Sequence, residues 1–420
     1  MKKLRILVLA LAAALLLLSF SVLSIPAIRA EAHTFTPSDT ASFTLNAKVL
    51  DSGQQIVSLT IDPGRLRIKP SSLNVDTFTV HAKGSNPFPD TLEPDQFFSE
   101  FSLDRTVTGV HLDRRGRIVV ELASGYGVAG ASTLAWANDV QRNIVLDLEY
   151  TVTQTSPITL LNSHRVTFSS LTQGPTLDPE VDAYANGQAA GLNYRLFTPN
   201  GTGKRPLIVW LHGLGEGGWP GAQDTDLSLL ANRGARGFST AKAQAIFGGA
   251  YVLAPQATDF WLNDREMGYS AKLTAHIDAV VDGNHIDKSR IYLVGASNGG
   301  YMTARITADN PGFFAAQVPI CPVLNFGPWT TITDAELATV RTPTWVVAAT
   351  TDDTVPFEAN AQHLAQTVPG ALLSAYPDVT WDGVTYPTHW SWIYAGRNDP
   401  ITDKGLRLWQ WMAKQTLKHQ

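Results

Sequence analysis

The chain has 420 residues, enough for two domains that each bury a core of their own. Hydrophobic residues make up 44% of the chain and charged residues 16%. The formal net charge is −5, without a basic stripe that could neutralise phosphates, so we do not expect nucleic-acid binding. Cys321 is the only cysteine, which excludes an intrachain disulfide and a metal site built from several cysteines. We expect Cys321 to be a small buried hydrophobic residue.

Residues 1–32 have the pattern of a secretory signal peptide. Lys2 and Lys3 precede an apolar run over residues 6–22, and residues 30–32 (AEA) supply an A-x-A cleavage site. We therefore expect export, removal of this segment and a location outside the cell. The alternative is an uncleaved segment that anchors the protein in the membrane, because the apolar run is almost long enough to span a bilayer.

Residues 33–170 are predicted to form an immunoglobulin-like β-sandwich. Short alternating runs rich in Val, Thr, Ile and Phe are separated by turn signals such as residues 62–64 (DPG). Roughly six or seven such strands without a long helical period are typical of a sandwich, although the Cys…Trp…Cys pattern of antibody domains is missing. Residues 171–190, which contain Pro175 and Pro179, are predicted to be a linker.

Residues 191–420 change to alternating strands and helices. Strands are predicted at residues 207–211 (LIVWL), 291–294 and 344–349 (TWVVAA), all apolar enough to be buried on both faces. Helical spacing of apolar residues is clearest over residues 403–417. This alternation predicts an α/β architecture, a mostly parallel sheet with helices on both faces.

A nucleophile is predicted where the strand at residues 291–294 ends. Residues 295–299 read Gly-Ala-Ser-Asn-Gly and are followed by a helical segment, so this G-x-S-x-G has the strand–turn–helix setting of a nucleophile elbow. Side chains at Gly295 and Gly299 would collide with neighbouring backbone in so tight a turn. Ser297 is therefore the candidate nucleophile.

A serine hydroxyl needs a base to take its proton and an acid to orient that base, and in this type of sheet they follow in the order Ser, Asp, His. Asp352 lies just after the predicted strand at residues 344–349, with Asp353 as its adjacent rival. The histidines that follow are His363, in a helical run, His389, in a loop before the final helix, and His419, at the terminus. Chain order and loop position favour His389 and the adjacent pair of aspartates, of which we prefer Asp352 because only one of two neighbouring residues can point inward.

The oxyanion of a tetrahedral intermediate needs two backbone N–H donors. One is predicted at Asn298, directly after the nucleophile. The other is predicted at Leu214, in the glycine-rich loop after residues 207–211. His212 and Glu216 are expected to order this loop rather than to react.

Three tryptophans are predicted to wall a substrate pocket. Trp261, Trp390 and Trp392 lie on predicted loops at the same edge of the sheet as Ser297. Ordinary core packing is an equally good explanation for each.

Several motifs together resemble the secreted α/β-hydrolase esterases, a group that includes prolyl-oligopeptidase-like predicted peptidases, feruloyl esterases and polyhydroxybutyrate depolymerases. They are residues 194–199 (YRLFTP), 207–213 (LIVWLHG), 295–300 (GASNGG) and 389–392 (HWSW). Residues 77–84, 116–122 and 146–150 resemble the immunoglobulin-like domain that precedes the catalytic domain in EstA-type esterases.

The resemblance implies Ser297 as nucleophile, Asp352 as acid and His389 as base, in agreement with the residues themselves. One departure is Leu214, where the family pattern has Ala or Ser; the backbone donor survives this change, but the pocket becomes narrower.

Together these features predict an exported serine carboxylesterase that hydrolyses short-chain carboxylic esters through an acyl-enzyme, with no metal and no organic cofactor. One alternative is a serine peptidase of the prolyl-oligopeptidase-like type, although the sequence marks no peptide-binding propeller. Another is a polyester or feruloyl ester depolymerase whose immunoglobulin-like domain binds the substrate. A non-enzymatic alternative is an inert hydrolase-fold protein that binds surfaces. The N-terminal domain is a further candidate for self-association.

Overall fold

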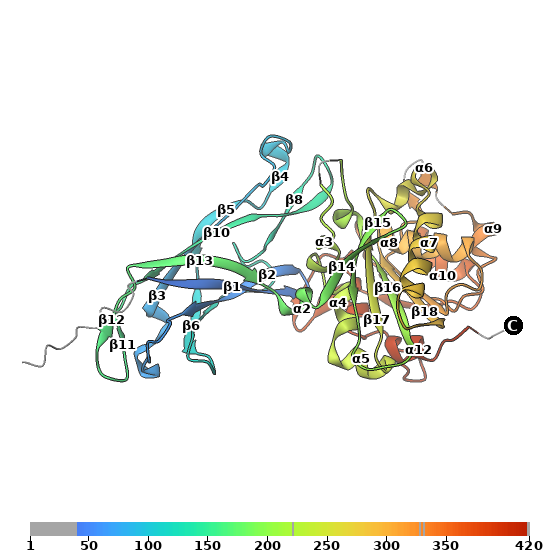
Figure 1. Ribbon diagram of the computed structural model, residues 1–420. Helices are drawn as coiled ribbons and strands as arrows, with labels where there is room; N and C mark the ends of the chain where they lie inside the picture. Colours follow the sequence, from blue (N-terminus) through green and yellow to red (C-terminus); the bar gives the residue numbers. More distant parts are fainter. Residues whose placement is uncertain (1–39, 221, 327–328, 331, 418–420) are drawn as a thin grey trace, which may run out of the picture. The chain divides into compact units, whose positions relative to one another are not determined.

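The computed structural model describes residues 40–417 apart from 221, 327, 328 and 331 (Figure 1). The predicted signal peptide and His419 lie outside the described residues. Among the described residues, no helix has both the length and the hydropathy needed to cross a membrane.

The N-terminal part is built from β-strands that share one apolar core. In β3 (Phe78–Ser85), Phe78, Val80 and Ala82 are buried while Thr79 and His81 are exposed, the two-residue alternation of a half-buried strand. Residues of a five-stranded sheet and of a three-stranded sheet share this core. An immunoglobulin-like topology for this part stays a prediction.

The strand orders are as follows. The five-stranded sheet runs β13 (Ser170–Leu177), β1 (Thr40–Leu50), β2 (Gly53–Asp62), β7 (Ile118–Leu122), β6 (Val107–Leu112). The three-stranded sheet runs β10 (Asp147–Gln154), β3, β5 (Phe101–Arg105). Smaller sheets pair β11 (Ile158–Thr159) with β12 (Arg165–Val166), and join β4 (Phe97–Phe98), β8 (Leu134–Ala137) and β9 (Arg142–Val145).

The segment at residues 171–190, predicted to be a linker, is largely regular structure. Strand β13 pairs in parallel with β1, and β14 (Tyr184–Ala189) is the first strand of the next sheet. Between them Pro179 begins α2 (Pro179–Asp182), whose first amides bond to the Asp178 side chain. The prolines indicated a loop, whereas Pro179 occupies the first helical position, where its missing N–H costs no hydrogen bond.

The second part of the chain contains an eight-stranded sheet. Its order is β14, β15 (Leu192–Phe197), β17 (Tyr251–Gln256), β16 (Arg205–Leu211), β18 (Ile286–Ala296), β19 (Ala316–Ile320), β22 (Trp345–Ala349), β23 (Leu372–Tyr376). The pairs from β17 to β23 are parallel, and only the two at the β14 end are antiparallel. The predicted mostly parallel sheet is confirmed.

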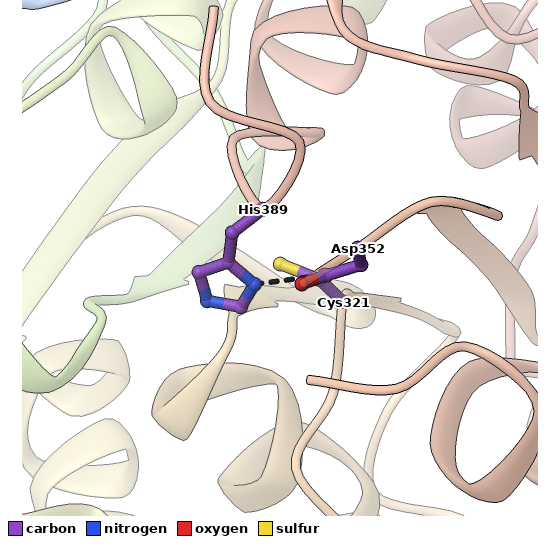
Figure 2. A group of neighbouring side chains, drawn as sticks. All are labelled: Cys321, Asp352 and His389. Carbon is purple, nitrogen blue, oxygen red and sulfur yellow. Dashed lines mark hydrogen bonds and ion pairs between the residues drawn. The ribbon is translucent and has the colours of Figure 1, made fainter. Parts of the chain in front are cut away.

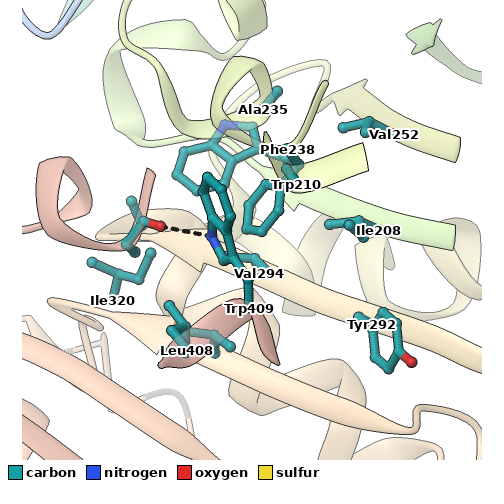
Figure 3. Packing of buried hydrophobic residues seen from close by; sticks show 14 of the residues in the cluster. Ile208, Trp210, Ala235, Phe238, Val252, Tyr292, Val294, Ile320, Leu408 and Trp409 are labelled. Atoms are coloured by element: carbon teal, nitrogen blue, oxygen red, sulfur yellow. Dashed lines mark hydrogen bonds between the residues drawn. The ribbon is translucent and has the colours of Figure 1, made fainter. Parts of the chain in front are cut away.

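Helices cover both faces of this sheet because its central strands are apolar throughout. In β16, Ile208 and Trp210 belong to one core while Leu207, Val209 and Leu211 belong to the other. Figure 3 shows the first core. The helices that pack into it are α3 (Leu227–Leu230), α4 (Gly234–Ser239), α5 (Ala241–Phe247), α11 (Trp392–Gly396) and α12 (Leu408–Ala413).

In the first core the Trp409 indole donates a hydrogen bond to the Ala395 carbonyl at 3.0 Å, which joins α12 to α11.

The opposite face is covered by α7 (Tyr269–Asp282) and α8 (Asn298–Asp309), with the short α6 (Asp264–Met267) beside them. Farther along, α9 (Asp334–Leu337) and α10 (His363–Thr367) pack against β22. The short hairpin strands are β20 (Asn325–Phe326), β21 (Trp329–Thr330), β24 (Thr380–Trp381) and β25 (Val384–Thr385).

A buried arginine joins the N-terminal strands to the second part. Arg142, at the start of β9, is 1% exposed, and its Nε and Nη2 each donate to a loop carbonyl, of Gly217 and Gly218, at 2.8 Å. The guanidinium also pairs with Asp259 at 2.8 Å and lies 3.7 Å from the centre of the Phe260 ring. One side chain thus satisfies several buried acceptors of the loop after β16.

Replacing this side chain should destabilise the protein. In Arg142→Met the Gly217 and Gly218 carbonyls lose their donors, and we expect the free energy of unfolding to fall by about 3 kcal/mol. Arg117→Met is the matched control, because Arg117 forms an ion pair at the surface and its loss should cost less than about 1 kcal/mol. Urea unfolding followed by tryptophan fluorescence measures both. Equal losses in the two variants would contradict the structural role of Arg142.

Candidate active site

Ser297 lies at a sharp turn between β18 and α8. Its backbone has φ 57° and ψ −115°, a conformation that residues other than glycine rarely adopt. A Cβ on Gly295 would lie 2.3 Å from the Gly299 carbonyl oxygen, and one on Gly299 would lie 2.1 Å from the Leu211 carbonyl oxygen. Both glycines are therefore required for the turn, as the sequence predicted. The Ser297 side chain makes no capping hydrogen bond with the described residues of α8, so its hydroxyl is not committed to the helix.

Asp352 and His389 come together from two loops beyond the sheet. The Asp352 Oδ1 accepts hydrogen bonds from the amides of Thr354 and Val355 at 3.0 and 2.8 Å. Its Oδ2 lies 2.8 Å from His389 Nδ1 (Figure 2). The two backbone amides fix the position of the carboxylate, and the carboxylate orients the imidazole ring of His389.

The competing candidates lie elsewhere. Asp353 is exposed, and its carboxylate accepts a hydrogen bond from the Thr354 hydroxyl at 3.2 Å. His363 forms a pair at the surface with Asp334, at 2.7 Å. The structure therefore brings together the residues that the sequence favoured, Asp352 and His389.

Ser297 and His389 line the same cavity. With Nδ1–H donated to Asp352, the ring leaves Nε2 as a proton acceptor. Burial acts to lower the pKa of His389, but the neighbouring Cys321 and Asp352 side chains raise it, and the net shift is upward. The hydrogen bond to Asp352 stabilises the imidazolium that forms when His389 takes a serine proton. The arrangement can therefore support nucleophilic catalysis by Ser297.

The loop after β16 is ordered by two buried side chains. His212 accepts a hydrogen bond from the Ala257 amide on Nε2 at 3.0 Å, so its proton is on Nδ1, 2.6 Å from the Gly213 carbonyl. Burial lowers the pKa of His212 to about 4, which keeps the ring neutral. His212 thus fixes the start of the loop that carries Leu214.

Glu216 ties the same loop to the N-terminal part. Its Oε1 accepts a hydrogen bond at 2.8 Å from the side-chain amide of Asn143, a residue of β9. The backbone N–H of Gly213 donates to the same carboxylate. Burial raises the pKa of Glu216 to about 7, although both hydrogen bonds act in the opposite direction. The loop is therefore held from outside as well as from within.

The cavity has a volume of about 540 Å³. Leu214 and Asn298, the predicted oxyanion donors, line it together with Ser297, as do Trp390 and Trp392. The ring centres of these two tryptophans lie 5.9 Å apart in a stacked pair. Further lining residues come from the N-terminal strands and their loops: Asp51, Ser52, Ser99, Ser132, Leu134, Ala135, Trp136, Gln141 and Asn143.

Trp261 does not belong to this cavity, which corrects the sequence-based prediction. Its side chain is fully buried, and its ring packs against His212 and Tyr269 with centre distances of 5.0 and 5.3 Å. The residue follows β17 at the expected edge, but it points into the core beneath the loop. It therefore stabilises the fold behind His212 and does not contact the cavity.

Sequence reasoning missed the residues that the N-terminal part contributes. Trp136 and Asn143 lie on β8 and β9, inside the region that the sequence predicted to be a β-sandwich. Neither residue belongs to a motif, so no local signal identified them. The prediction for Cys321 was incomplete in a similar way, because it is buried but its neighbours include His389 and Asp352.

Residues 270–374, which include Ser297 and Asp352, match the prolyl oligopeptidase family. A thermostable esterase of known structure superimposes with a TM-score of 0.68 and 23% sequence identity, covering 89% of this chain and 99% of that chain. Est1E from Butyrivibrio proteoclasticus matches at a TM-score of 0.38 and 16% identity, covering 51% of this chain and 94% of its own. No curated protein matches by sequence.

The second part of the chain has the α/β-hydrolase fold. Strand order, the sharp turn at Ser297 and the superposition on the thermostable esterase agree on this point. Because that superposition covers 89% of the chain, it extends over much of the N-terminal part as well.

The raised pKa of Glu216 predicts a pH-dependent cost to stability. A carboxyl group whose pKa is higher in the folded state than in the unfolded chain lowers stability as pH rises from about 4.5 to about 7. Glu216→Gln removes this cost. Through that pH range the free energy of unfolding of the variant should therefore rise relative to the wild type, by on the order of 3 kcal/mol once the pH exceeds the pKa of both the unfolded and the folded state. Urea unfolding at about pH 5 and about pH 8 measures the difference. If the difference in free energy of unfolding between variant and wild type is the same at both pH values, the raised pKa of Glu216 is contradicted.

Proposed function

We propose that the protein is a serine carboxylesterase acting on short-chain esters. The observation that carries this is the Ser297 turn, which opens into a cavity also lined by His389, itself bonded to Asp352 at 2.8 Å. Ser297 attacks the ester carbonyl, His389 takes the hydroxyl proton and then gives it to the leaving alcohol, and Asp352 orients the ring. The acyl-enzyme is then hydrolysed by water with His389 again as base.

The amides of Leu214 and Asn298 are proposed to hold the oxyanion. Both residues line the cavity beside Ser297, one on the loop after β16 and the other in the first turn of α8. The positive end of the α8 dipole adds to this stabilisation. Asn298 is also fixed through its side chain, which accepts a hydrogen bond from the Leu262 amide at 2.9 Å.

The cavity walls support a small ester over an extended peptide or polymer. Leu134, Leu214, Val323 and Trp390 give an apolar lining, and residues of the N-terminal part close one side. An acyl chain of a few carbons binds favourably against such a lining, because its apolar surface is removed from water. A peptidase must also protonate a poor amine leaving group. The peptidase and depolymerase alternatives predict different outcomes in an assay with p-nitrophenyl esters and peptide anilides.

The test is hydrolysis of p-nitrophenyl acetate, butyrate and octanoate, alongside peptide p-nitroanilides. We expect the esters to be cleaved with rates that fall as the chain lengthens, and Ser297→Ala to lose on the order of a millionfold in kcat. His389→Gln should be similarly inactive. His363→Gln is the matched control, because His363 also pairs with an aspartate but at the surface, and should keep the wild-type rate.

Ester turnover that survives in Ser297→Ala would contradict the assignment of the nucleophile. Cleavage of anilides but not of esters would favour the peptidase. If the wild type cleaves neither, the proposed activity is wrong, and a polymer depolymerase or an inert binding protein becomes the better explanation.

Export is also part of the proposal and rests on the pattern of residues 1–32. When the gene is expressed in a secreting host, mass spectrometry of the protein from the medium should show a chain that begins after residue 30 or 32. A full-length chain recovered with the membranes would instead indicate the uncleaved anchor.

A further inference from the structure

The only cysteine of the chain lies beside the Asp352–His389 pair. Cys321 directly follows β19 and is 1% exposed, and its amide donates to the Val347 carbonyl of the neighbouring strand at 2.8 Å. This bond fixes Cys321 at the end of the sheet next to the loop that carries Asp352. Figure 2 shows its sulfur beside the hydrogen bond between the carboxylate and His389.

Three different donor atoms converge at this point. The Cys321 sulfur, a carboxylate oxygen of Asp352 and a ring nitrogen of His389 all lie within 4.8 Å of one another. Bonds of about 2.0–2.3 Å in a tetrahedral site place neighbouring donors about 3.5 Å apart. For such a site the Nδ1–Oδ2 distance of 2.8 Å has to open slightly, and any separation near the 4.8 Å limit has to close.

The donor set has the chemistry of a zinc site. Thiolate, carboxylate and imidazole are all ligands of Zn²⁺, and the thiolate selects against the hard cations Mg²⁺ and Ca²⁺. With Cys321 deprotonated, the thiolate and the Asp352 carboxylate together neutralise the charge of the ion inside a buried site. His389 lines the cavity, whereas Cys321 and Asp352 are buried behind it.

We propose that Zn²⁺ binds to Cys321, Asp352 and His389 and inhibits the enzyme reversibly. The inference deepens the proposed function, since the site is built on two members of the proposed triad. On binding, the thiol proton leaves to solvent and Nδ1 of His389 coordinates the ion in place of its hydrogen bond. The proton of the neutral ring then resides on Nε2. A ring in this form cannot accept the Ser297 proton, so attack on the ester stops.

The first experiment measures binding without any substrate. Chelator-treated wild type is titrated with Co²⁺, which takes zinc sites and gives a near-ultraviolet absorption band when a thiolate coordinates it. We expect one ion per chain and the band in the wild type, and loss of the band in both Cys321→Ser and Cys321→Ala. Far-ultraviolet circular dichroism shows whether each variant is folded. A wild type that gives no thiolate band would overturn the proposal, whether or not the protein is an esterase.

The second experiment measures inhibition of p-nitrophenyl butyrate hydrolysis by Zn²⁺. Since loss of an outer partner already weakens metal sites about 10- to 100-fold, loss of the Cys321 ligand should raise the inhibition constant by more than about 100-fold. Each variant is compared with its own rate in a chelator. His363→Gln is the control, because the surface pair of His363 and Asp334 offers zinc an imidazole and a carboxylate.

Inhibition that is unchanged in Cys321→Ser, or that disappears in His363→Gln, would place the ion elsewhere and overturn the proposal. If neither the wild type nor any variant hydrolyses an ester, the proposed function fails while the Co²⁺ titration still decides the metal site.

Discussion

The site depends on a backbone conformation that only glycine neighbours permit. Ser297 holds φ 57° between β18 and α8, and the carbonyl oxygens of Gly299 and Leu211 fill the space where the Cβ atoms of residues 295 and 299 would be. A strained residue persists only when its surroundings over-determine it. Here the surroundings are a sheet buried on both faces and a helix that begins at the next residue. The cores of the sheet therefore hold the hydroxyl at the cavity.

The parts of this arrangement that the sequence predicted are those encoded by local patterns. Apolar runs such as residues 207–211 identified buried strands, and the glycines around Ser297 identified the turn. Chain order then pointed to His389 and to the neighbouring residues Asp352 and Asp353, because loops that follow parallel strands meet at the same edge of the sheet. Each inference needed only a short stretch of sequence and a rule of topology.

The parts that escaped prediction depend on contacts between distant segments. Trp261 lies at the edge that the sequence indicated, yet its side chain packs behind His212, and the direction of a side chain is not encoded in chain position. Asn143 and Trp136 reach the cavity from strands of another sheet, and no periodicity marks such a contact. Pro179 was misread because the same residue type ends helices and begins them.

The hydrogen bonds from β9 to the loop after β16 have a consequence for how such a protein can evolve. Arg142 and Asn143 bond to Gly217, Gly218 and Glu216, so a single strand of the N-terminal part determines the shape of a loop in the hydrolase part. Domains that meet only through a flexible connection can be exchanged between genes as independent modules. The two parts of this chain do not meet in that way, because a hydrolase part joined to a foreign N-terminal part would have a loop without its donors. We therefore expect the pair to be transmitted as one hereditary unit, with changes in β9 and in this loop occurring together.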